Sequence, residues 1–254
     1  MHKVLLFIIL VLTGLAGCSG PNEKVVVATA ANLQHVMPEL KAAFESQSDS
    51  EIEIQFGSSG QLSTRIREGA PIDIFVSADT LYPYEIHRNG GSDAPPQVYA
   101  RGTLVLWTLD STTTTDLSLS TLLGSSVSKI ALANPATAPF GQAAVQAMQQ
   151  AGIYEQVKDR LLYAENTAQV TQQLTSGAAG AGFTALSIVL SPAMKGKGRW
   201  IKIDSAAYRP LVQAAVLLRH NEDSFKRQPS RDFFEFLYSE KAKAIFRNYG
   251  YAVD

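Results

Sequence analysis

Four short stretches of small and hydroxyl-bearing residues could hold an anion without using a positive charge. They are AAN at 30–32, GSSG at 57–60, APFG at 138–141 and ENTA at 165–168, and each comes directly before a segment of helical pattern. The N-terminus of a helix exposes unpaired N–H groups and about half a positive charge, so it attracts anions. Several such ends meeting at one point would form a cage of neutral hydrogen-bond donors.

The free energies permit such a cage, but the residues also have a simpler interpretation. Hydrogen bonds to a charged group contribute about 1.5–3 kcal/mol each, and nanomolar affinity requires about 12 kcal/mol. About six well-placed donors would therefore suffice, before the costs of ordering and closure are subtracted. Small, Ser-rich residues are also common in turns before helices, and Asn32 or Ser59 could be ordinary N-caps. The residues alone leave both interpretations open.

Catalytic and metal chemistry have little support in the sequence. Ser59 lies in a tight Gly-Ser-Ser-Gly turn, but it lacks the G-x-S-x-G spacing of a nucleophile and no His-and-acid pair is indicated beside it. The four histidines are scattered and form no metal-ligand pattern. We expect His35 to be partly exposed, Asp79 to cap a helix and Asp73 to flank a strand. No catalytic residue is predicted, and we expect the protein not to be an enzyme.

The elements that must position the four junctions follow an alternating pattern. From Val25 onward, short apolar runs alternate with segments of helical period, which is typical of βα units and a mostly parallel sheet. The expected strands are 25–29, 51–56, 72–76, 129–133 and 180–184, the two long extended runs are 99–107 and 210–219, and residues 167–174 and 232–249 are expected to be helical.

The two long extended runs predict an α/β protein of two lobes. If the chain crosses between halves at each run, lobe 1 is built from 25–102 and 215–254, and lobe 2 from 103–214. Each lobe would be a mostly parallel sheet flanked by helices. Ligands of such architectures lie at the carboxyl ends of strands, in the cleft between lobes. The junctions are therefore expected to face this cleft.

The first residues indicate export rather than folded structure. Residues 1–17 have the form of a signal peptide, with a positive Lys3 and an apolar run too short to span a membrane as a helix. The end of this segment, LAGC, resembles the lipobox of bacterial lipoproteins, which implies cleavage before Cys18 and a lipid on its thiol. Cys18 is the only cysteine, so an intramolecular disulfide is excluded, and a buried free thiol is the alternative. Residues 18–24 are then a flexible tether.

Overall charge excludes one class of partner. The formal net charge of this 254-residue chain is −1, with 18% charged residues, which gives no broad field for nucleic acid or anionic lipid surfaces. We therefore expect no nucleic-acid partner. Any anion must be held by local geometry.

Five segments resemble the molybdate-binding proteins of bacterial ABC importers, which are type II periplasmic binding proteins. The matching stretches are AANLQHVMPEL, FGSSGQLSTRIREGAPIDIFVSAD, ANPATAPFGQAA, AGFTALS and IFRNYGY. The long GSSGQL…GAPIDIFVSAD block is highly specific, whereas GFTALS alone would be weak. The resemblance implies two hinged α/β lobes that close on molybdate or tungstate through uncharged donors from helix starts.

The resemblance also implies which residues hold the oxyanion. Carried over by motif, they are Ala31 through its backbone N–H, Asn32, Ser59, Phe140 and Thr167. Relatives have a small residue or a tyrosine where this chain has Phe140, and a valine N–H where it has Thr167. Some relatives also have a ligand-binding tyrosine after the glycine of a late strand, but the sequence Gly-Phe-Thr-Ala at 182–185 offers none. We therefore expect backbone N–H groups to donate a larger share of the hydrogen bonds to the oxyanion than in those relatives.

By the same resemblance, the protein would be a monomeric, lipid-anchored receptor on the extracytoplasmic face. It would hold the molybdate or tungstate oxyanion through those five residues, use no cofactor or other metal, deliver the oxyanion to an ABC permease, and be attached to the membrane through Cys18. Two alternatives remain: a receptor for another oxyanion such as sulfate or phosphate, and a small-molecule hydrolase or transferase on the same fold. The absence of a recognisable nucleophile, base or metal set disfavours the second.

Overall fold

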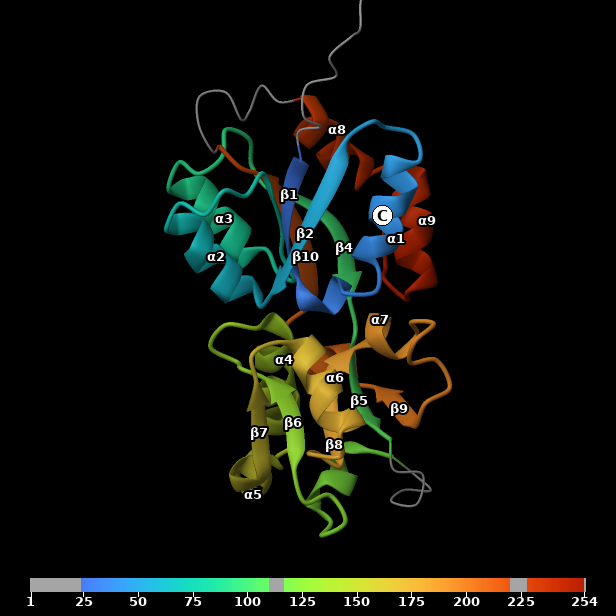
Figure 1. The fold of residues 1–254 in the computed structure, drawn as a ribbon. Helices are drawn as coiled ribbons and strands as arrows, with labels where there is room; N and C mark the ends of the chain where they lie inside the picture. Colours follow the sequence, from blue (N-terminus) through green and yellow to red (C-terminus); the bar gives the residue numbers. More distant parts are fainter. Residues whose placement is uncertain (1–23, 110–116, 220–227, 254) are drawn as a thin grey trace, which may run out of the picture.

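The computed structural model describes residues 24–109, 117–219 and 228–253, which form two lobes, each built around one five-stranded sheet (Figure 1). The strand order is β2-β1-β3-β10-β4 in the first sheet and β7-β6-β8-β5-β9 in the second. The predicted signal peptide, most of the tether and Cys18 lie outside the described residues, as does the polar segment 111–116. No helix in the described parts of the chain is both long and apolar enough to cross a membrane.

The first sheet is mixed. Its parallel strands are β1 (Lys24–Ala30), β2 (Glu51–Gly57) and β3 (Ile74–Val76), with β1 in the middle of the three. Strand β10 (Leu211–Leu217) pairs antiparallel with β3 and with β4 (Gln97–Gly102). The valine-rich run therefore lies inside the sheet, and its carboxyl end points toward the other lobe (Figure 1).

The second sheet repeats this plan. Strand β6 (Ile130–Ala133) lies between β7 (Leu161–Ala164) and β8 (Ala181–Ala185), and all three are parallel. Strand β5 (Leu104–Thr108) pairs antiparallel with β8 and with β9 (Arg199–Lys202). The two-lobed α/β fold is thus confirmed, with one strand in each sheet, β10 or β5, running opposite to the other four.

Helices cover both sheets. Those of the first lobe are α1 (Met37–Glu45), α2 (Ser59–Arg67), α3 (Leu81–Arg88), α8 (Gln228–Phe236) and α9 (Glu240–Asn248). Those of the second lobe are α4 (Pro139–Gln150), α5 (Tyr154–Val157), α6 (Thr167–Thr175) and α7 (Leu186–Val189). Helices α2, α4 and α6 each follow a parallel strand, so their N-termini lie at the carboxyl edge of a sheet.

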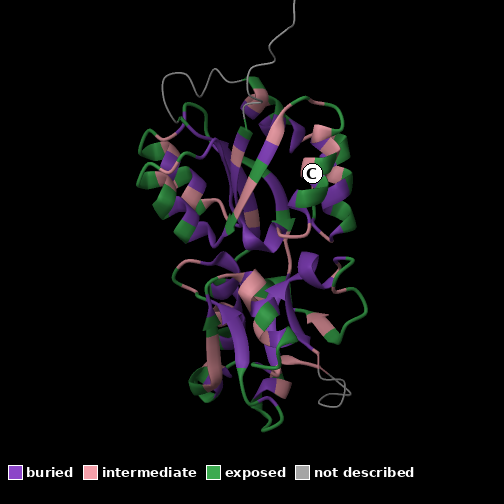
Figure 2. Ribbon diagram, viewed as in Figure 1, coloured by how far each residue is buried: buried purple, intermediate pink, exposed green. Residues whose placement is uncertain are grey.

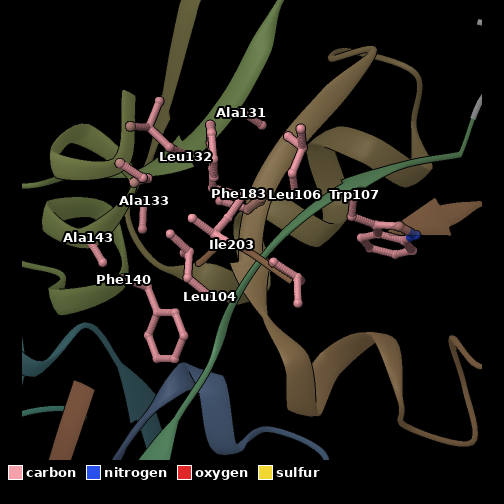
Figure 3. Packing of buried hydrophobic residues seen from close by; sticks show 14 of the residues in the cluster. Leu104, Leu106, Trp107, Ala131, Leu132, Ala133, Phe140, Ala143, Phe183 and Ile203 are labelled. Carbon is pink, nitrogen blue, oxygen red and sulfur yellow. The ribbon is translucent and has the colours of Figure 1, made fainter. Parts of the chain in front are cut away.

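Each lobe has an apolar core of its own, and the core of the second lobe continues to Ala30, Ala78 and Leu211 of the first lobe. The first lobe has one cluster that includes Phe44, Phe233 and Phe246, and a second that includes Phe75 and Leu62. The second lobe has a single large cluster, which contains Trp107 and Phe183 (Figure 3). Buried residues follow both sheets and also occupy the segments where the lobes meet (Figure 2).

The extended run at 99–107 is where the chain first passes between lobes. It forms two strands of different sheets, because β4 ends at Gly102 and β5 begins at Leu104. The expected second boundary, between residues 214 and 215, falls inside β10, all of which pairs within the first sheet. The return crossing therefore lies before Leu211.

The segment of helical pattern that follows AAN and the predicted helix 232–249 are each divided into two pieces in the structure. After β1 the chain makes a short 3₁₀ helix at Ala31–Leu33, and α1 begins only at Met37. The C-terminal segment forms two helices because Ser239 caps α9, its side chain accepting from the Ala242 N–H. Helical periodicity does not report such breaks, since both pieces bury residues on the same side.

Candidate functional site

A small pocket lies where the two lobes meet at the carboxyl ends of the parallel strands. Its volume is about 10 Å³, which is room for about one water-sized sphere and far below the roughly 300–1,000 Å³ of pockets for drug-sized ligands. The lining residues are Ala30, Ala31, Asn32, Gly57, Ser58, Ser59, Ala78, Ala138, Pro139, Phe140, Asn166 and Thr167. The structure therefore brings all five predicted site residues together, from three starts of α-helices and one 3₁₀ turn.

None of these lining residues carries an ionisable side chain. The walls are methyl groups, a proline and a phenylalanine ring, with hydroxyls, amides and backbone N–H groups between them. An anion in this pocket would meet the unpaired first-turn N–H groups and the positive ends of α2, α4 and α6. The site can thus attract negative charge without a lysine or arginine.

Ser59 has a hydroxyl proton to spare. The N-cap of α2 is Ser58, whose side chain accepts from the Gln61 N–H in a capping box, so Ser59 is not the cap. The Ser59 Oγ accepts from the Ala78 N–H at 3.0 Å, and its side chain is buried. Since a hydroxyl can donate and accept together, this fixed oxygen can donate to a ligand.

Thr167 is the first residue of α6, and its hydroxyl is also unused. The cap is the preceding Asn166, whose Oδ1 accepts from the N–H groups of Ala168 and Gln169 at 3.0 and 3.1 Å. The Thr167 Oγ1 is buried and has no hydrogen-bond partner among the described residues. The sequence indicated only a backbone donor here, so this hydroxyl is an additional side-chain donor.

Phe140 lies in the first turn of α4, which starts with Ala138 and Pro139 and has no side-chain cap. Its backbone N–H belongs to the group that a helix leaves unpaired. The buried ring extends from the second lobe's core toward the first lobe (Figure 3). Its Cζ lies 3.1 Å from where a Cβ on Gly102 would stand. A tyrosine hydroxyl would therefore meet the β4 crossing.

Asn32 is not a helix cap, because the 3₁₀ helix has Ala30 at its N-cap and no side-chain cap bond. Its Nδ2 instead donates to the Gln213 Oε1 at 3.0 Å and to the Tyr251 Oη at 2.8 Å. Its Oδ1 is buried without a partner in the described chain. The Asn32 Nδ2, which was expected to donate to the ligand, therefore donates to Gln213 and Tyr251 instead. The side-chain atom of Asn32 that remains free is the acceptor Oδ1.

Several hydrogen bonds cross between the lobes around the pocket. The Gly60 N–H donates to the Thr137 carbonyl at 2.8 Å, and the Tyr82 hydroxyl donates to the Ala136 carbonyl at 3.4 Å. On the other side, the Ser187 Oγ donates to the Asn32 carbonyl at 2.8 Å. These contacts can exist only when the lobes are together, so the structure represents the closed form.

Sequence reasoning missed the polar residues behind Asn32. Gln213 on β10, Tyr99 on β4 and Ser187 on α7 are all buried and join Asn32 and Tyr251 in one network. Burial raises the pKa of the Tyr99 and Tyr251 hydroxyls, so both keep their protons. Tyr251 and Ser187 gave a signal, as parts of the IFRNYGY and AGFTALS stretches. Gln213 and Tyr99 look like ordinary strand residues.

The remaining titratable residues singled out in the sequence lie outside the pocket lining. The N-cap of α3 is Thr80 rather than Asp79, but the Asp79 carboxylate accepts from the Ser77 hydroxyl and from the Tyr82 N–H in the first turn of α3. Desolvation raises the pKa of Asp79. His35 is half-buried, and burial lowers its pKa. In the described ranges, no group of three or more His, Cys, Asp or Glu residues could hold a metal ion.

Comparison with known proteins identifies the family. The model for bacterial extracellular solute-binding proteins matches residues 25–252, nearly the whole chain after the predicted signal peptide. The chain belongs to this family. Membership of an extracellular family places this solute-binding protein outside the cytoplasm.

Similar relatives of this solute-binding protein have a shared description. It is 33% identical over 245 residues to the molybdate-binding protein ModA of Rhodobacter capsulatus, covering 95% of this chain and 92% of that one. It is 32% identical over 241 residues to the molybdate-binding protein ModA of Azotobacter vinelandii, covering 94% of each. The solved periplasmic molybdate-binding protein of Azotobacter vinelandii superposes with a TM-score of 0.84 at 30% identity, covering 91% of this chain and 99% of that chain. The fold is thus that of a type II periplasmic binding protein, and the relatives are named as binding proteins rather than enzymes.

Proposed function

We propose that this protein captures molybdate outside the cytoplasm and delivers it to the permease of an ABC transporter. The observation that carries the proposal is the closed pocket, which has no ionisable side chain in its lining and receives hydroxyls and first-turn N–H groups from both lobes. Tungstate has the same shape and charge, so we propose it as an equivalent ligand. The names of the relatives and the coverage of nearly the whole chain support the same assignment.

The chemistry of the donors suits a fully deprotonated oxyanion. Ser59 Oγ and Thr167 Oγ1 can each donate one hydrogen bond, and the first-turn N–H groups of Ala31, Phe140 and Thr167 lie at the same pocket. A ligand with four acceptor oxygens uses all of these groups. A ligand that carries an O–H, such as phosphate near neutral pH, would need an acceptor in place of one donor.

Binding and closure are coupled in this proposal. The first lobe supplies Ser59, whereas the second supplies Phe140 and Thr167, so one oxyanion completes its hydrogen bonds only when the lobes meet. The ligand therefore favours the closed form by its higher affinity for that form. The permease would then recognise the surface that exists only after closure.

We also propose that the exported chain is a monomer attached to the membrane by a lipid on Cys18. The support is the pattern of residues 1–18 together with the extracellular family. Mass spectrometry of the protein purified from membranes should give an N-terminus at Cys18 carrying acyl chains. A mature protein that starts elsewhere, or that carries an unmodified Cys18, would remove this part of the proposal.

The test of the function is calorimetric titration of the mature protein with molybdate, tungstate, sulfate and phosphate. We expect micromolar or tighter binding of molybdate and tungstate, and much weaker heats with the other two. Micromolar binding of sulfate or phosphate with no heat from molybdate would overturn the proposal.

Variants of the pocket test the assignment of the site. Asn32→Ala combined with Ser59→Ala should weaken molybdate binding by far more than a few-fold, because Ser59→Ala removes a donor worth about 1.5–3 kcal/mol to a charged ligand. Asn32→Ala adds to this by removing the side chain that Gln213 and Tyr251 hold beside the ligand. The exposed Ser176→Ala is a matched control, since Ser176 lies at the far end of α6. An unchanged affinity in the double variant would show that the ligand binds elsewhere.

A further inference from the structure

We propose that Gln213 determines which end of the Asn32 side-chain amide faces the ligand, and thereby selects fully deprotonated oxyanions. This inference rests on the proposed function and concerns the same pocket. Gln213 lies on β10 behind the site, it is fully buried, and it does not line the pocket itself. It is a positioning residue, because it acts on the ligand only through Asn32.

The starting observation is a mismatched pair of amides. The Asn32 Nδ2 donates to the Gln213 Oε1 at 3.0 Å, which leaves the Asn32 Oδ1 and the Gln213 Nε2 both buried and without partners in the described chain. Asn32 is 2% exposed and Gln213 0%, so water does not replace the missing bonds at the surface. Buried polar groups are almost always paired, so two orphans on one bonded pair require an explanation.

Tyr99 supplies a second mismatch. Its hydroxyl oxygen lies 2.9 Å from the Ser77 carbonyl and 2.7 Å from the Gln213 Oε1, and both of these atoms are acceptors. Tyr99 has a single hydroxyl proton, so it can serve only one of them. If the Gln213 Nε2 stood in the place of Oε1, it would donate to Tyr99 while Tyr99 donated to Ser77. Both short contacts would then be hydrogen bonds.

Turning both amides over pairs the Asn32 Oδ1 and removes the Tyr99 mismatch, while the Gln213 Oε1 takes the position where Nε2 had no partner. The Gln213 Nε2 then donates to the Asn32 Oδ1 and to the Tyr99 hydroxyl, and the Tyr251 hydroxyl donates to the Asn32 Oδ1 across the existing 2.8 Å contact. The hydrogen bond that Tyr251 donates to the Ser187 Oγ at 3.0 Å is lost, because the single hydroxyl proton of Tyr251 now goes to the Asn32 Oδ1. The number of bonds inside the network is therefore conserved.

The turned pair changes what the ligand meets. The free atom of Asn32, which is the acceptor Oδ1 in the structure, becomes the donor Nδ2. An acceptor at this position repels an oxyanion that has no proton and accepts from one that carries an O–H. A donor does the opposite. Gln213 favours the donor orientation because its Nε2 can bond to the Asn32 Oδ1 and to Tyr99 simultaneously.

A double-mutant cycle tests this coupling. The variants are Gln213→Met, which keeps the length of the side chain without its amide, Asn32→Leu, and the combination, titrated with molybdate and with phosphate. Exposed Gln149→Met is the matched control. Gln213→Met should weaken molybdate binding by about tenfold and reduce the preference for molybdate over phosphate. In the Asn32→Leu background the same change should have no further effect.

The outcomes separate this inference from the proposed function. If the unmodified protein binds molybdate and Gln213→Met binds it with the same affinity, the role of Gln213 is overturned and the proposed function stands. The same conclusion follows if the losses of affinity in the two single variants simply add in the double variant. No binding by the unmodified protein would remove both.

An NMR experiment on the unmodified protein covers the case in which the variants fail to fold. The Gln213 Nε2 has no partner among the described residues in the orientation that the structure shows, and each of its protons acquires one in the turned pair. Addition of molybdate should therefore move both of their signals to the frequencies of hydrogen-bonded amides and slow their exchange with water. Gln213 signals that stay in place while the backbone signals of Ser59 and Thr167 move would overturn the inference.

Discussion

Gly60→Ala should weaken ligand binding while leaving the ligand-free protein at least as stable. Gly60 is the second residue of α2, and its N–H donates to the Thr137 carbonyl of the opposite lobe. A Cβ at this position would stand 2.7 Å from the Tyr82 Oη and 3.0 Å from both the Cα and the O of Thr137. The tyrosine ring can move aside, but the Thr137 backbone can yield only if the lobes separate.

The two effects have opposite signs because they act on different states. Overpacking of a close contact costs about 1–3 kcal/mol, and here it arises only in the closed form. Since the ligand binds the closed form, affinity should fall by about 5-fold to 150-fold. In the open form the residue is simply a helical position, where alanine is about 0.5–1 kcal/mol more favourable than glycine.

Two measurements on the same variant check this reasoning. Calorimetry with molybdate should give the weaker affinity, and urea unfolding without ligand should give a free energy of unfolding equal to or above that of the unmodified protein. Adding Tyr82→Phe should recover only part of the affinity, because the Thr137 backbone remains. Wild-type affinity in Gly60→Ala would refute the role of this contact in closure, and a loss of stability without ligand would refute the assignment of the effect to the closed state.

Three further predictions concern single side chains. Thr167→Val and Ser59→Ala should each weaken molybdate binding by about 10-fold to 150-fold, since each removes a donor worth about 1.5–3 kcal/mol. If calorimetry shows less than a twofold loss of affinity for Thr167→Val, the Thr167 hydroxyl does not bind the ligand. Phe140→Ala should lower the free energy of unfolding by about 3–5 kcal/mol because the ring is 2% exposed in the second lobe's core; denaturation curves that overlay the unmodified protein would contradict this. Burial lowers the pKa of His35 from 6.5, so the unfolded chain takes up a proton more readily than the folded protein, and the contribution of His35 to stability should be complete above this pH and decline below it. Urea unfolding of His35→Gln at about pH 7.5 and about pH 5.5 should show a smaller decline in the free energy of unfolding. An unchanged decline would show that other groups cause it.

The sequence could predict which strand-to-helix junctions form the site, because local residue patterns determine where each junction lies. The valine run of β1, the alternation in β2 and the small residues after each strand determine where strands end and helices begin. Each junction therefore has a fixed position at the carboxyl edge of a sheet. This is why Ser59, Phe140 and Thr167 lie around one pocket, together with Ala31 and Asn32.

The polar contacts of the site depend on residues far apart in the chain, and no local pattern reports them. Asn32 looked like a cap or a ligand donor, but its amide bonds to Gln213 and Tyr251, which are 181 and 219 residues away. Capping was equally hard to assign, because either serine of the GSSG turn could begin α2. The structure uses Ser58 and thereby leaves Ser59 for the pocket.

The extent of β10 shows a similar limit. Its sequence is a continuous apolar run, and such a run does not say at which residue a chain leaves one sheet for another. Pairing with β3 and β4 decides this, and it keeps the whole of Leu211–Leu217 in the first lobe.

The central claim is that neutral donors from both lobes hold a fully deprotonated oxyanion in the interlobe pocket. A crystal structure of the protein with molybdate, with data collected at the molybdenum absorption edge, tests this claim most directly. We predict one strong anomalous peak between the N-termini of α2, α4 and α6, with ligand oxygens within about 2.5–3.2 Å of Ser59 Oγ and Thr167 Oγ1. A peak outside this pocket, or a molybdate inside it that is contacted by a lysine or arginine side chain, would contradict the account.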